Sequence, residues 1–144
     1  MRLRDIASVN DYASRTLRKI DTGSSRDVYT LSSKKVLKVA LHEVGVEQNL
    51  NEWKHTEFSS VLPITVTHVC DEFGLWVVAE LVKPMSAQEF NDRCVGESYR
   101  FHPSFRDLLH KLAQEMCIAE GDLGREDQWG TDTCGEMKLL DYGV

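Results

Sequence analysis

The stretch Glu120-Gly121-Asp122-Leu123-Gly124-Arg125-Glu126-Asp127, with the later Leu139-Leu140-Asp141-Tyr142-Gly143, decides how this chain is interpreted. Asp122 and Asp127 stand five positions apart in an acidic, glycine-bearing loop, and Asp141 follows an apolar, strand-like run. Taken alone, the segment also fits a solvated loop that leads into a strand ending in a turn. Whether this segment is a chemical site or a surface loop must therefore be decided from the rest of the sequence.

Length and composition describe an ordinary globular domain. The chain has 144 residues, of which 42% are hydrophobic and 28% charged, so a core can form and a disordered or fibrous chain is excluded. The net charge of -6 provides no basic surface, and we expect no nucleic-acid partner. The sequence contains neither an apolar run of membrane-spanning length nor a secretory signal, so we expect no membrane association and a cytoplasmic protein.

The cysteines and histidines show no metal-ligand spacing. There is no Cys-x-x-Cys pair and no His-Glu-x-x-His motif. Free thiols in a reducing compartment are the expectation for Cys70, Cys94, Cys117 and Cys134.

Short strand-like segments dominate the first half of the chain. A helix is predicted first, over about residues 5–14, and we expect it to pack on the outside of the strands that come after it. A second helix, with Val46, Leu50 and Trp53 at helical spacing, is predicted between the third and fourth strands. The strands are predicted at residues 16–21, 27–31, 36–41, 63–70 and 75–82.

Lys38 lies in the middle of the apolar third strand. A charge there must either point to solvent at a sheet edge or meet a partner. The helix that follows carries Glu52, 14 positions after Lys38, and Glu47 is the reserve candidate. We predict that the Lys38 and Glu52 side chains lie within salt-bridge distance of each other.

The second half of the chain is predicted to be mainly helical. Ser86-Ala87-Gln88-Glu89 has the form of a capping box and should begin a helix. Pro103 begins the strongest helical pattern in the chain. Its apolar positions are Phe105, Leu108, Leu109, Leu112 and Met116.

Glycine and charged positions form an ordered set over residues 16–143. The set is Gly23, Lys38, Glu52, Glu80, Asp122, Asp127 and Asp141. In order and separation it resembles the protein-kinase-like superfamily. Because Gly121-Asp122 has no arginine before the aspartate, the chain is more similar to small-molecule and aminoglycoside phosphotransferases, and to compact kinase-like proteins of bacteria and their phages, than to eukaryotic protein kinases.

The resemblance implies an α+β fold in a single kinase-like domain over residues 1–144. Residues 16–84 would form an N-lobe, a five-stranded antiparallel sheet with one helix. Residues 85–144 would form a partial, truncated helical C-lobe that ends at the Asp-Tyr-Gly motif.

The resemblance also implies that ATP binds the N-lobe. Gly23, Ser24 and Ser25 would contact the phosphates. Lys38 would grip the phosphates and be oriented by Glu52. The hinge, from Glu80 to Val82, would offer its backbone to adenine.

The acidic positions take the remaining implied roles. Asp122 would orient an acceptor hydroxyl as the catalytic residue. Asp127 and Asp141 would hold Mg²⁺, and Asp127 keeps an oxygen ligand although the usual residue at its position is asparagine.

Several positions depart from the family pattern. Gly23 is the only glycine left in the glycine loop, with Asp21 and Arg26 at the flanking positions. Glu120 replaces the usual histidine. The sequence ends at Val144, and we expect no activation segment or further C-lobe helix in this chain.

Three interpretations stay open at this point. The chain can be a minimal ATP- and Mg²⁺-dependent phosphotransferase, or a catalytically inactive, pseudokinase-like binding protein of a phage or bacterium that docks onto a partner protein. The third is an unrelated α+β domain with a coincidental motif set.

The apolar stripe of the 103–116 helix predicts an interface. In a full kinase such a helix is partly covered by helices that this sequence lacks, and an exposed stripe of this size marks a contact surface. We expect it, with residues 139–144, to be covered by a second copy of the chain or by another protein.

Overall fold

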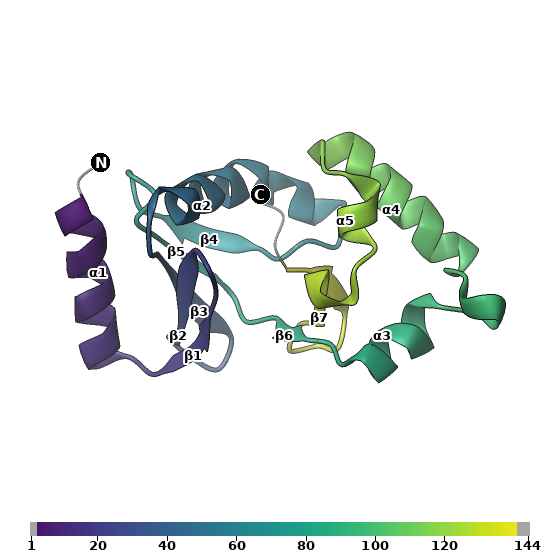
Figure 1. Cartoon of the computed structure of the whole chain (residues 1–144), viewed down its shortest axis with the longest axis horizontal. Coiled ribbons are helices and arrows are strands. Elements are labelled where there is room, and N and C mark those ends of the chain that lie inside the picture. Colours follow the sequence, from purple (N-terminus) through teal and green to yellow (C-terminus); the bar gives the residue numbers. More distant parts are fainter. Residues whose placement is uncertain (1–2, 141–144) are drawn as a thin grey trace.

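The computed structural model describes residues 3–140. The predicted metal ligand Asp141 lies outside the described residues. Figure 1 shows a half that contains a sheet with α1 and α2 and a half that contains α3, α4 and α5, with β6 and β7 between them. Within residues 3–140, no helix has the length and apolar character needed to cross a membrane.

The first half is a five-stranded sheet with the strand order β1-β2-β3-β5-β4. Every neighbouring pair in it is antiparallel. Its strands are β1 (Lys19–Thr22), β2 (Arg26–Thr30), β3 (Lys35–Ala40), β4 (Thr67–Cys70) and β5 (Trp76–Glu80). Because α2 (Glu43–His55) connects β3 to β4, the predicted order of five strands with a helix between the third and fourth is confirmed.

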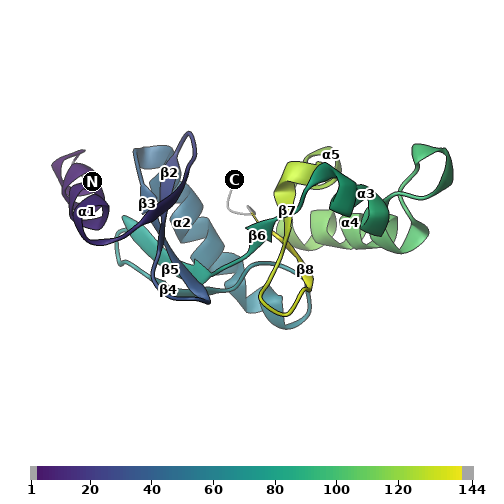
Figure 2. The ribbon, with the colours of Figure 1, turned by 90° about the horizontal axis from the view of Figure 1, so that it is seen from below.

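Different helices cover the two faces of this sheet, and Figure 2 shows β2 and β3 between α1 and α2. Side chains alternate between the faces along each strand. Tyr29 and Val39 therefore point to one face, where α1 (Leu3–Thr16) buries them against Ala13. Lys38 points to the opposite face, toward α2. The N-terminal helix packs on the outside of the sheet, as predicted.

The local signals for the later helices are confirmed. The Ser86 hydroxyl accepts a hydrogen bond from the Glu89 N–H at 3.1 Å, and α3 (Ala87–Cys94) follows. α4 (Pro103–Met116) begins with the predicted proline, whose missing N–H costs nothing in a first turn.

The second half combines these helices with short strands and turns. Its three-stranded sheet has the order β6-β7-β8, with β6 (Lys83–Pro84), β7 (Trp129–Thr131) and β8 (Met137–Leu139). A short helix, α5 (Glu120–Leu123), precedes β7. Single turns of 3-10 helix lie at η1 (Thr56–Ser60), η2 (Glu97–Tyr99) and η3 (Glu126–Gln128).

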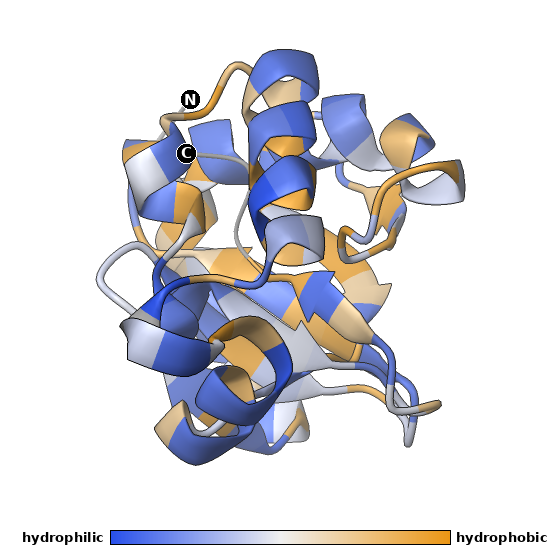
Figure 3. Cartoon of the chain, turned by 90° about the vertical axis from the view of Figure 1, so that its right-hand side faces the viewer, coloured by the Kyte–Doolittle hydropathy of each residue, from blue (hydrophilic) through white to orange (hydrophobic). Residues whose placement is uncertain are grey.

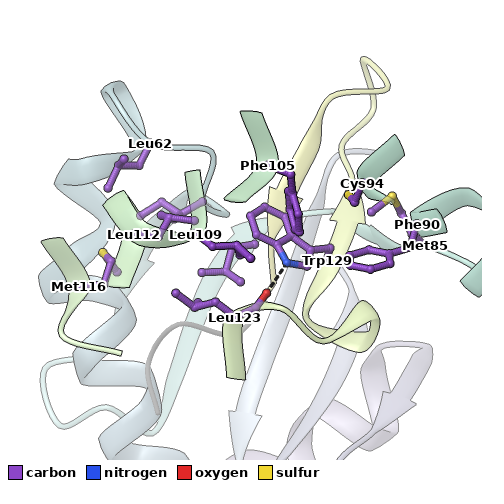
Figure 4. Close-up of a cluster of buried hydrophobic side chains, with 12 residues drawn as sticks. Leu62, Met85, Phe90, Cys94, Phe105, Leu109, Leu112, Met116, Leu123 and Trp129 are labelled. Atoms are coloured by element: carbon purple, nitrogen blue, oxygen red, sulfur yellow. Dashed lines mark hydrogen bonds between the residues drawn. The ribbon is translucent and has the colours of Figure 1, made fainter. Parts of the chain in front are cut away.

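Trp129 lies at the centre of the apolar core of this half (Figure 4). It is fully buried, and its indole N–H donates to the Leu123 carbonyl at 2.7 Å. Its ring packs edge-on against Phe105 with centroids 5.4 Å apart. Through Trp129, β7 therefore anchors both α5, which carries Leu123, and α4.

The expectation that the apolar stripe of α4 is exposed is wrong. Phe105, Leu109, Leu112 and Met116 are all at most 4% exposed. They pack against each other and against residues from β7, β8 and the segment after α2. Figure 3, which faces the helical half, shows mostly hydrophilic residues on the outer surface of its helices. The chain's own short strands supply the cover that we expected from a partner.

The segment before β4 does not begin the fourth strand as predicted. The strand starts at Thr67, and Ile64 instead forms a parallel bridge with Leu139 of β8. The Leu139 N–H donates to the Pro63 carbonyl at 2.7 Å, and the Leu139 carbonyl accepts from the Thr65 N–H at 3.0 Å. These bonds join the two halves.

A glycine allows a second close junction. A Cβ on Gly130 would lie 2.5 Å from the Lys83 carbonyl oxygen and 2.8 Å from Val82 Cγ1. Only glycine therefore lets β7 approach the segment that links β5 to α3.

Candidate functional site

A cleft lies between the sheet half and the segment after β5. Its larger part is a cavity of about 530 Å³, with mainly apolar walls. Val28 and Val36 line it from the sheet, Val82 lines it from the linking segment, and Leu140 lines it from the end of the described chain. A cavity of this size is in the range that holds a small ligand.

A smaller hollow of about 210 Å³ adjoins the cavity. Asp21, Val28 and Lys38 line both spaces, so we describe the two neighbouring spaces together as the cleft. The walls of the hollow are more polar than those of the cavity. They include Gly23, Ser24, Ser25, Arg26, Gln48 and Gln128. The predicted glycine loop therefore lines the polar end of the cleft.

The predicted ion pair between Lys38 and Glu52 is present. The Lys38 ammonium lies 3.2 Å from Glu52 Oε1, and both side chains are buried. The register of β2 and β3 sets Lys38 opposite Val28, at the point where the apolar and polar parts of the cleft meet. The reserve candidate Glu47 is exposed.

Arg26 is a second cation on the same carboxylate, and the sequence interpretation missed it. Its Nη2 lies 2.6 Å from Glu52 Oε2, and its Nη1 donates to Asn49 Oδ1 at 3.1 Å. Asn49 in turn donates to the Gly74 carbonyl at 2.8 Å. The available signal was an arginine at a position where the family pattern has glycine, with Asn49 and Glu52 three positions apart on one helix face.

The two cations control the charge of Glu52. Burial alone would raise the pKa of Glu52, but attraction and hydrogen bonding by Lys38 and Arg26 outweigh burial and lower it. Glu52 is therefore ionised at neutral pH, and it can hold both cations in place.

Two polar groups of Glu80 are already bonded within the protein. Its N–H donates to the Val66 carbonyl at 2.9 Å, so this donor is not available to a base. Its carboxylate accepts from Lys138 Nζ at 2.7 and 2.9 Å. Glu80 contributes to the cavity wall, and a contact of its backbone with a base stays a prediction.

The segment that follows Val82 pairs with β7. The Met85 N–H donates to the Trp129 carbonyl at 3.1 Å, and Lys83 lies opposite Thr131. Since backbone polar groups alternate in direction along a strand, those of Val82 point away from β7. Val82 also lines the cavity, so its N–H and carbonyl are the candidate contacts.

Lys138 of β8 forms an ion pair with Glu80 of β5, which links the two halves. Besides Glu80, it lies 3.2 Å from Asp132 Oδ2. Burial lowers the pKa of Lys138, but hydrogen bonding and attraction by Glu80 and Asp132 outweigh burial, so its pKa is raised. For Asp132, burial is opposed by N–H donors from Glu136 and Cys134 and by Lys138, which together lower its pKa. The pair of carboxylates thus keeps Lys138 charged at the junction.

The predicted acidic residues lie on exposed backbone. Asp122 is exposed on α5, and Asp127 is exposed on η3, where it pairs with Arg125 at 2.6 Å. Within residues 3–140, no three His, Cys, Asp or Glu side chains gather as a metal site.

One hydrogen bond joins the segment that carries Asp127 to the end of the described chain. The Leu140 N–H donates to the Gln128 carbonyl at 2.8 Å. Gln128 directly follows Asp127, and Leu140 directly precedes Asp141. Both Gln128 and Leu140 line the cleft.

No family model and no curated protein matches the chain. Solved structures do match. The GDP complex of an aminoglycoside 2'-phosphotransferase-IIIa mutant aligns with a TM-score of 0.53 at 9% identity, over 96% of this chain and 71% of that one. The streptomycin-ATP complex of APH(2")-IIa aligns with a TM-score of 0.50 at 10% identity, over 95% and 70%. The gentamicin complex of APH(2")-IIa gives 0.50 at 12%, over 95% and 69%.

Proposed function

Because the chain has the α+β fold of the protein-kinase-like superfamily, we propose that its cleft binds ATP and that it transfers a phosphoryl group to a hydroxyl acceptor. One observation carries the proposal. A buried Lys38–Glu52 pair lies at the boundary between an apolar cavity and a polar hollow. A nucleotide needs this combination, with apolar walls for its base and a cation for its phosphates.

Each end of the cleft suits one part of the nucleotide. The apolar cavity would hold the base between Val28, Val36 and Leu140, with the Val82 backbone as hydrogen-bonding partner. Lys38 would contact the phosphates, and the loop from Gly23 to Ser25 would lie over them.

In phosphoryl transfer, Asp122 would act as the general base. The acceptor hydroxyl oxygen forms a bond to the γ-phosphorus while the bond between that phosphorus and the bridging β-γ oxygen breaks. The hydroxyl proton passes to the Asp122 carboxylate, and ADP leaves. The exposure of Asp122 leaves room for an acceptor to approach it.

Magnesium would be held by carboxylate oxygens. Asp127 is an exposed oxygen ligand of the kind that Mg²⁺ prefers, and it would have to release Arg125 to bind the ion. Asp141 is the second ligand that the motif predicts. The bound ion would neutralise phosphate charge.

A nucleotide-binding protein without transfer activity is the second candidate. The Arg125–Asp127 pair favours it, because this pair occupies one of the two predicted metal ligands. Docking onto a protein partner stays a prediction, and the α4 stripe no longer supports it because that stripe is buried.

Variants at Asp122 and Asp141 test the proposal. We expect Asp122→Ala to bind MgATP like the unchanged chain and to lose release of ADP in the presence of an acceptor hydroxyl. Asp141→Ala should weaken binding in magnesium. Asp107→Ala, an exposed change on α4, is the matched control. Binding without any ADP release by the unchanged chain would favour the second candidate, and no binding would contradict both.

A further inference from the structure

Glu52 is shared unequally between its two cations. Arg26 approaches to 2.6 Å and Lys38 to 3.2 Å, each on a different carboxylate oxygen. A guanidinium also offers several donors in a fixed plane, whereas an ammonium on a flexible stem is a point charge. Arg26 is therefore the better-placed partner of this carboxylate.

Arg26 is fixed from a second side, and Lys38 is not. Arg26 also donates to Asn49, which is fully buried and bound to the Gly74 carbonyl. Within residues 3–140, Glu52 is the one ion-pair partner of Lys38. Lys38 lines both parts of the cleft. Its side chain can therefore move a short distance away from Glu52 and still face a ligand in the cleft.

The loop next to Arg26 is fastened to the start of α2. Ser25 Oγ donates to Gln48 Oε1 at 2.7 Å, and the Ser25 carbonyl accepts from the Leu41 N–H at 2.8 Å. A Cβ on Gly45 would lie 2.2 Å from that carbonyl oxygen, so the helix approaches the loop as closely as a glycine allows. Arg26 thus connects a loop and a helix that already touch.

Lys38 is the cation of this cluster that would gain most from a bound anion. It shares the Glu52 carboxylate with Arg26, and its own side chain is nearly buried. Buried charges are stable only when they are paired. A phosphate in the adjoining hollow would give Lys38 a negative charge that it does not share.

We propose that Arg26 is a positioning residue that keeps Glu52 and the phosphate loop attached to α2, which leaves Lys38 free to exchange Glu52 for a nucleotide phosphate. This inference rests on the proposed nucleotide site. It assigns the two cations different tasks, with Arg26 holding the helix and Lys38 holding the ligand.

Binding of ATP and of adenosine by Arg26→Met tests this division. Without Arg26, Glu52 keeps Lys38, so the affinity for MgATP should fall about tenfold while adenosine affinity stays within about twofold. Arg15→Met, which removes an exposed arginine of α1, should leave both affinities unchanged. Equal losses for ATP and adenosine would show a general structural defect and overturn the inference.

A double-mutant cycle gives the second readout. If Arg26 acts by freeing Lys38, then Arg26→Met should change MgATP affinity by less than about twofold once Lys38→Met is present. The same tenfold loss in both backgrounds would overturn the inference, because Arg26 would then act without Lys38.

Two further outcomes separate the inference from its premise. Absence of ATP binding by the unchanged chain contradicts the nucleotide site itself and removes this inference with it. Normal ATP binding by Arg26→Met contradicts only the inference.

If Arg26→Met does not fold, Arg26→Lys is compared instead. It keeps a cation near Glu52 but loses the second bond to Asn49, so we expect a smaller loss, still confined to ATP, and equal losses for ATP and adenosine would again overturn the inference.

Discussion

The two halves of this molecule differ in the charged groups that they bury, although both contain buried apolar residues. The sheet half buries Arg26, Lys38, Asn49 and Glu52 in one connected group beneath its cleft. The helical half buries an apolar cluster around Trp129, and within residues 85–140 of the described chain no charged residue is classed as buried. Polar groups are stable in an interior only with specific partners, whereas apolar groups need only volume. We infer that the first half fixes the geometry of the site and that the second half supplies stability.

This comparison predicts the largest effect for Trp129→Ala. The change removes a fully buried ring and its hydrogen bond to Leu123, and it should lower the free energy of unfolding by about 3–5 kcal/mol. Urea unfolding measures it. Trp53→Ala is the matched control on the half-exposed face of α2, and it should cost less than about 1 kcal/mol. Equal costs would contradict the location of the core.

Glu52→Ala should be nearly as destabilising, for a different reason. It leaves the cations of Arg26 and Lys38 buried without their shared carboxylate, which costs about 3 kcal/mol or more. Glu47→Ala removes an exposed glutamate of the same helix and should cost less than about 0.5 kcal/mol. Unfolding by urea distinguishes them, and a harmless Glu52→Ala would mean that the buried group does not hold α2.

Lys138→Met tests the charged junction between the halves. It removes two hydrogen bonds to Glu80 and the contact with Asp132, and it should cost about 1.5–3 kcal/mol. The exposed Lys111→Met on α4 serves as the control. If Lys138→Met unfolds like the control, the charged junction does not stabilise the fold.

The dependence of stability on pH should show the smallest effect. The folded chain holds the pKa of Glu52 below its ordinary value of 4.5. The resulting stabilisation is therefore complete above that ordinary value and is lost as the pH falls through the lowered one. Glu52→Gln should remove this part of the acid sensitivity in urea unfolding at about pH 7 and about pH 4. An unchanged pH dependence would assign the acid sensitivity to other carboxylates.

Local patterns were sufficient for much of the fold. Strand-favouring residues between turn segments located five strands, and Ser86 and Pro103 located the starts of α3 and α4. Lys38 and Glu52 could be paired because a strand lysine followed by an acidic helix is a local arrangement, 14 positions long.

The errors arose where distant segments meet. The bond between Lys138 and the Glu80 carboxylate was not predicted, because the two residues lie 58 positions apart. The α4 stripe was expected to be exposed because strands as short as β7 and β8 give no clear periodic signal, although they cover it. Arg26 was treated as a missing glycine, and its bonds to Glu52 and Asn49 depend on tertiary packing.

Calorimetric titration of MgATP into the unchanged chain and into Lys38→Met tests the central claim most directly. The cleft between the halves should give saturable heat below roughly 1 mM ATP. Lys38→Met should weaken binding by about tenfold or more, and it should stay folded because Arg26 still holds Glu52. Lys54→Met, an exposed change on α2, should bind like the unchanged chain. Equal binding by the unchanged chain and Lys38→Met, or no heat with either, would contradict the account.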